Sequence, residues 1–186
     1  IALCSGYVIM LALLWVFGRF APSVLNHSFN KMQIVSAAVM AFSHGSNDAQ
    51  KAMGIITLAL LSGGLIETFE VPTWVMLVCA VSMALGTAAG GKKIIKTMGT
   101  HIFRMVPING FAADLGAALV ISLATFFHLP VSTTHVISGS IMGVGSAKRV
   151  TAVRWKVAQN MLMAWVLTIP LSAAVGVLIY KVTLYL

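Results

Sequence analysis

Polar residues with ion-binding side chains interrupt an apolar segment that runs from residue 33 to residue 62. The interruption contains Gly45, Asn47, Asp48 and Lys51. An amide and a carboxylate are ligands for small cations, and ionisable groups at membrane depth usually bind or carry ions. This motif is therefore the first place in the chain where we expect function.

The composition assigns the chain to the integral membrane proteins. Hydrophobic residues make up 59% of it and charged residues 9%, with a mean hydropathy of +0.97, well outside the soluble range. A formal charge of +8 would suggest nucleic acid in a soluble protein. Here the basic residues gather in short loops between apolar runs, so we expect the lipid bilayer, and no nucleic acid, as the partner that explains them.

No motif predicts an enzyme, a bound cofactor or a structural metal. Cys4 and Cys79 each lie in an apolar run, so they form neither a disulfide framework nor a metal-binding spacing. A nucleophile elbow, a P-loop and a metal-binding helix are also missing from the sequence. We expect no metal other than Na⁺.

The apolar runs predict an all-α polytopic protein with about six membrane passages, each near the length that a bilayer requires. They cover residues 1–17, 33–62, 73–90, 108–128, 134–147 and 157–181. Basic residues cluster in the loops before the fourth and the sixth passage, which predicts that these loops are cytoplasmic and that both chain ends lie outside the plasma membrane. The chain is expected to form a single transmembrane unit, residues 1–186.

Two of these passages are expected to be broken or re-entrant helices. Gly45 followed by cap-type residues predicts a half-helix that begins inside residues 33–62. Pro130 predicts the end of one helix, and a short return helix follows it within residues 108–147. Each helix start would direct free N–H groups into a cavity, which suits a phosphate-like oxyanion.

The buried carboxylates Asp48 and Asp114 need a cation. Asp48 with Asn47 offers hard oxygen ligands for Na⁺, and protonation of a carboxylate is the rival device. An alternative role for Lys51 is to neutralise Asp48 or another carboxylate, and an alternative for Asp114 is an ion pair with Arg104 or a loop lysine. We expect hydrogen-bonding roles for His44 and His135, which flank the polar motifs.

Residues 42–54, Phe-Ser-His-Gly-Ser-Asn-Asp-Ala-Gln-Lys-Ala-Met-Gly, and residues 130–135, Pro-Val-Ser-Thr-Thr-His, resemble the two signatures of the inorganic phosphate transporter (PiT) family in its bacterial low-affinity form. The resemblance covers essentially the whole chain. It implies secondary active symport of inorganic phosphate with Na⁺ or H⁺ by alternating access. The substrate-binding residues that it implies are Ser46, Asn47, Asp48, Ser132, Thr133 and Thr134, and the coupling-ion residues are Asn47, Asp48 and Asp114.

The form of the first motif, with Gln50 and Lys51 after Asp48, resembles the carboxyl-terminal one of the family's two inverted repeats. The expected partners are inorganic phosphate and the amino-terminal repeat of the same transporter, which would complete the cavity. The choice between Na⁺ and H⁺ as the coupling ion stays open, and so does the formation of a homodimer. So do an anion channel and transport of another tetrahedral oxyanion such as sulfate.

Overall fold

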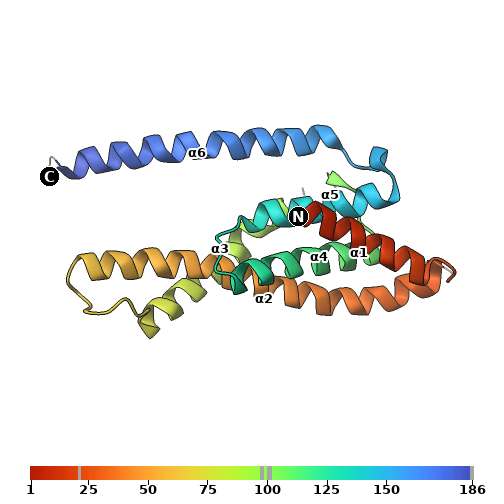
Figure 1. Cartoon of the computed structure of the whole chain (residues 1–186), viewed down its shortest axis with the longest axis horizontal. Helices are drawn as coiled ribbons and strands as arrows, with labels where there is room; N and C mark the ends of the chain where they lie inside the picture. The colour runs from red at the N-terminus through yellow and green to blue at the C-terminus, as the bar shows by residue number, and fades with distance from the viewer. Residues whose placement is uncertain (21, 97–98, 100–101, 185–186) are drawn as a thin grey trace. The chain divides into compact units, whose positions relative to one another are not determined.

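The computed structural model describes residues 1–20, 22–96, 99 and 102–184, and these residues form helices joined by short loops (Figure 1). The helices are α1 (Ala2–Phe17), α2 (Pro22–Ser62), α3 (Thr73–Lys96), α4 (Pro107–Phe126), α5 (Thr133–Lys148), the 3₁₀ turn η2 (Val150–Ala152) and α6 (Trp155–Leu184). The chain divides into two units, Ile1–Val153 and Arg154–Leu186. The all-α prediction is confirmed, and the site lies in the first unit.

Three helices of the described chain are long and apolar enough to cross a membrane: α3 over Thr73–Gly91, α4 and α6. The apolar helix α1 is shorter, with 16 residues. The long helix α2 does not qualify, because its polar motif lowers the hydropathy of the segment around it. The number of six passages therefore stays a prediction.

The break expected at Gly45–Asp48 is not found, because α2 is one continuous helix from Pro22 to Ser62. No proline follows Pro22 within this helix, and a single glycine costs a helix only about 1 kcal/mol. The side chains of Asn47 and Asp48 bond to groups outside the α2 backbone and so do not cap a new helix. This part of the sequence prediction was wrong.

The second polar motif does start a helix. Pro130 lies in the loop that follows α4, and α5 begins at Thr133 with Ser132 as its N-cap. The Ser132 hydroxyl accepts a hydrogen bond of 3.4 Å from the backbone N–H of His135, the usual role of serine at this position. The prediction that α5 is a short return helix within the membrane stays a prediction.

Glycines allow the backbones of α1, α4 and α5 to approach closely, and these three helices pack against one another. A Cβ on Gly143 would lie 2.1 Å from the Leu3 carbonyl oxygen, and one on Gly6 would lie 2.3 Å from that of Ser140. The Ser140 hydroxyl donates to the Ala113 carbonyl at 2.9 Å. Small residues and hydroxyl groups are the usual means by which helices associate in lipid.

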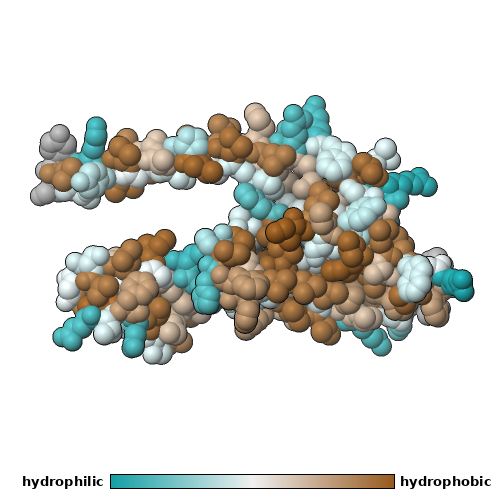
Figure 2. Space-filling view, viewed as in Figure 1, coloured by the Kyte–Doolittle hydropathy of each residue, from teal (hydrophilic) through white to brown (hydrophobic). Residues whose placement is uncertain are grey.

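Helix α2 packs on the other side of α4, and the buried residues Met40, Ala117, Ala118, Ile121 and Val136 form the core between α2, α4 and α5. Much of the outer surface is apolar (Figure 2). Exposed residues such as Ile55, Leu58, Leu77 and Val81 lie on α2 and α3. Such a surface is expected where lipid, rather than water, is the solvent.

We predict that G143A destabilises the protein by about 1–3 kcal/mol, because the added methyl group overpacks the α1–α5 contact. Thermal unfolding in detergent measures the effect as a lowered Tm. G86A is the matched control, since nothing lies within 4 Å of a Cβ at Gly86. An equal Tm for both variants would contradict this packing.

Candidate functional site

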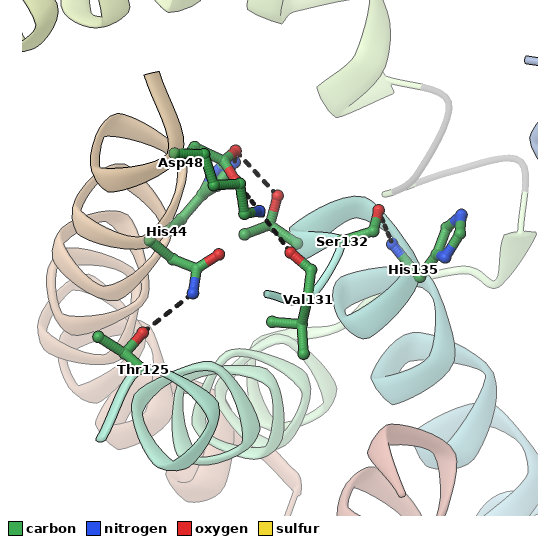
Figure 3. A network of polar contacts seen from close by, with 9 residues as sticks. His44, Asp48, Thr125, Val131, Ser132 and His135 are labelled. Carbon is green, nitrogen blue, oxygen red and sulfur yellow. Dashed lines mark hydrogen bonds and ion pairs between the residues drawn. The ribbon is translucent and has the colours of Figure 1, made fainter. Parts of the chain in front are cut away.

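The carboxylate of Asp48 is the centre of the polar site (Figure 3). Its Oδ1 accepts a hydrogen bond of 3.1 Å from the Lys51 ammonium. Its Oδ2 accepts one of 3.0 Å from the hydroxyl of Thr133 and lies 3.0 Å from Nε2 of His44. Of the alternatives left open for Lys51, the structure shows the pairing with Asp48, and His44 contacts the same carboxylate.

Lys51 makes a second contact, with the backbone carbonyl of Val131 in the loop before α5 (Figure 3). Lys51 to Val131 and Thr133 to Asp48 therefore both join the middle of α2 to the start of α5. The two sequence motifs, about 80 residues apart in the chain, form one site in space.

Asn47 lies beside Asp48 and faces α4. Its side-chain NH₂ donates to the Thr125 hydroxyl at 3.0 Å, and the residue is 4% exposed. Its carbonyl oxygen Oδ1 is buried and has no hydrogen-bond partner within the described chain. An unpaired buried acceptor is costly, so this oxygen is available to a cation or a donor from a ligand.

A pocket of about 380 Å³ opens at this place between α2 and the end of α4. It is lined by Asn47, Gln50, Lys51, Thr125, His128, Leu129 and Pro130. Two of its lining residues, Asn47 and Lys51, are also part of the polar network around Asp48. The pocket therefore gives a small ligand access to that network.

The remaining substrate residues predicted from the sequence lie next to this centre. Ser132 and Thr134 flank buried Thr133 and are exposed, and the Thr134 carbonyl accepts from the Ser138 hydroxyl at 2.7 Å. Ser46, partly exposed, precedes Asn47 on α2. Among the predicted substrate-binding residues, Asp48 and Thr133 are joined by a direct side-chain hydrogen bond.

Asp114 lies apart from this site. Its Oδ2 accepts a hydrogen bond of 3.1 Å from Ser36 on α2. Ser36 precedes Asp48 by twelve residues on this helix, which corresponds to about 18 Å along a helix axis. The ion pair with Arg104 is not the contact found, and the loop residues Lys92 and Lys93 lie outside the side chains that the structure describes.

Three partners in these networks were missed by the sequence analysis: Thr125, Val131 and Ser36. Val131 contributes a backbone carbonyl, to which its side-chain type gives no clue. Thr125 and Ser36 are single hydroxyl residues in apolar helices, where they commonly bond their own backbone. Only the packing of α2 on α4 shows that their hydroxyl groups serve Asn47 and Asp114.

The fold and the site define a helical membrane protein with a polar centre between packed helices. Residues 8–176 match the phosphate transporter family, and the chain belongs to this family. It is 49% identical over 181 residues to a probable low-affinity inorganic phosphate transporter of Bacillus subtilis (strain 168), with 97% of this chain and 54% of the relative covered.

Another relative and a solved structure agree with this assignment. A probable low-affinity inorganic phosphate transporter of Rhizobium meliloti (strain 1021) is 45% identical, with 94% of this chain and 54% of the relative covered. The solved structure, described as the sodium-dependent phosphate transporter, has a TM-score of 0.71 at 30% identity and covers 86% of this chain and 41% of its own. The chain thus spans about half the length of the curated relatives that it matches.

We predict that T133V lowers stability by about 1.5–3 kcal/mol, because a hydrogen bond to a charged group is lost from a buried position. Thermal unfolding in detergent measures this loss. T134V, at the exposed neighbouring position, controls for the change of side chain on the first turn of α5. If T133V unfolded at the same temperature as T134V, the Thr133–Asp48 bond would have no energetic weight.

Proposed function

We propose that the chain forms one half of a secondary active transporter that carries inorganic phosphate together with Na⁺ or H⁺. The observation that carries this proposal is the Asp48 centre, where a carboxylate and the unpaired oxygen of Asn47 lie beside a pocket between helices. The names of the relatives and of the solved structure support phosphate as the substrate.

Phosphate would bind at the start of α5. Ser132 and Thr134 are exposed residues there, and the free N–H groups of a helix start favour an anion. Ser46, Asn47 and Thr133 would provide further polar contacts in this proposal. Donors without a fixed arginine clamp can release the phosphate again.

The coupling cation would bind at Asp48. A cation bound at Asp48 would add a positive charge beside the pocket, which favours the phosphate anion and makes the two ligands bind together. We propose Na⁺ first, because the similar solved structure is described as sodium-dependent, with H⁺ as the rival. Asp114, on α4, bonds to Ser36, which lies twelve residues from Asp48 along α2, so it is too far from Asp48 to share that cation, and an ion bound there would be a second one.

Alternating access requires a second wall for the pocket. The curated relatives are about twice as long as the part that this chain matches. We propose that an amino-terminal repeat in the inverted orientation supplies that wall in a multi-pass protein of the plasma membrane, with the basic loops in the cytoplasm. This arrangement would carry the coupled ions through the pocket beside Asp48.

Uptake of radiolabelled phosphate into liposomes tests the proposal, with the transporter that contains this chain reconstituted at full length. An inward Na⁺ gradient is expected to drive saturable uptake, and an inward proton gradient alone to drive less. Uptake driven by protons only would transfer the coupling role to H⁺. Absence of gradient-driven phosphate uptake under both conditions would refute the proposed symport, and non-saturable flux would favour a channel.

We predict that D48N reduces cation-driven phosphate uptake at least about tenfold, since a charge-assisted contact of 1.5–3 kcal/mol or more is lost. The same liposome assay measures this change. E67Q is the control, because it removes an exposed carboxylate from the loop between α2 and α3. Unchanged uptake and cation dependence in D48N would remove Asp48 from the mechanism.

A further inference from the structure

The ammonium group of Lys51 is bonded to oxygen atoms that a coupling cation would need as ligands. It contacts Asp48 Oδ1 at 3.1 Å and the carbonyl oxygen of Val131. A carboxylate and a backbone carbonyl from a loop between two helices are typical ligands of Na⁺ in transporters. Lys51 therefore satisfies this oxygen pair in the way that a bound cation would.

We propose that Lys51 is a tethered competitor of the coupling cation and thereby sets the affinity of the Asp48 centre for Na⁺. This inference rests on the proposed symport and adds to it a residue that determines cation affinity. Na⁺ binding displaces the ammonium group from Asp48 Oδ1 and the Val131 carbonyl. When Na⁺ leaves, Lys51 returns, and Asp48 is never left without a counter-charge.

The position of Lys51 suits this exchange. Its side chain is 39% exposed and that of Asp48 is 25% exposed, so the pair is weak enough to open. Lys51 also lines the pocket beside Asn47 and Gln50. A released ammonium group can move into this space and regain solvent, while the cation gains the oxygen atoms.

Displacement of Lys51 would also affect the start of α5, where phosphate is proposed to bind. Helix α2 packs mainly on α4 and α3 and only slightly on α5, so the contacts of Lys51 with Val131 and of Asp48 with Thr133 form much of the link between α2 and α5. Displacement of Lys51 removes one of these two contacts. The start of α5, with its exposed hydroxyl residues, is then held to α2 through the cation and Thr133.

The first test needs no substitution. Purified full-length transporter in detergent is treated with an amine-reactive acylating reagent in NaCl or in choline chloride of equal ionic strength, and mass spectrometry measures the labelling rate of each lysine. We expect Na⁺ to increase the labelling of Lys51 and to leave Lys31 unchanged. Lys31 is the internal control because it is exposed on the same helix, twenty residues away. A Lys51 rate that stays constant or falls in Na⁺ would overturn the proposal.

The second test uses variants of the same residue. The Na⁺ concentration that gives half of the Na⁺-dependent rise in Tm is expected to fall about two- to fivefold in K51Q, because an exposed ionic competitor of modest strength has been removed. K51R keeps the charge and should retain the wild-type value, and K31Q removes an equivalent charge elsewhere on α2. A higher or unchanged value in K51Q would show that Lys51 only neutralises Asp48.

Phosphate uptake by the wild-type protein separates the two levels of inference. Na⁺-driven uptake together with Na⁺-independent Lys51 labelling would reject the competitor role and leave the symport standing. Na⁺-dependent labelling without any phosphate uptake would support the exchange at Lys51 and reject the proposed substrate.

Discussion

The neutralisation of one carboxylate, that of Asp48, is the constraint on which the rest of the site depends. A carboxylate in a helix of apolar surroundings is costly unless it is paired and hydrogen-bonded. Asp48 has Lys51 and His44 on its own helix and Thr133 on α5. Because the third partner comes from another helix, satisfying this carboxylate also fixes where α5 begins relative to α2.

The close packing of α1, α4 and α5 supports this arrangement. Glycines at the contact points bring the backbones together, and Ser140 ties α5 to the Ala113 carbonyl of α4. Helix α4 in turn contacts α2 through the bond between Thr125 and Asn47. The helices that carry the polar groups are thus held together largely by close backbone contacts.

The ion pair between Lys51 and Asp48 is of a strength that would suit the proposed exchange. Pairs between partly exposed charges contribute about 0.2–1 kcal/mol, and Lys51 and Asp48 are such a pair. A deeply buried ion pair would resist replacement by a transported ion. The proposed exchange would therefore combine a fixed frame, made by α4 and α5, with a charged contact that is weak enough to open.

The sequence by itself determined the membrane class, the helical fold and the two motifs, because composition and local patterns of apolar and polar residues carry that information. It wrongly predicted a break in α2 at Gly45–Asp48, since cap-type residues also serve as side-chain partners for other helices. Only the tertiary structure joined Asp48 to Thr133, gave Lys51 the Val131 carbonyl and separated Asp114 from the site. These contacts depend on how distant helices pack, and no local pattern in the chain encodes a partner some 80 residues away.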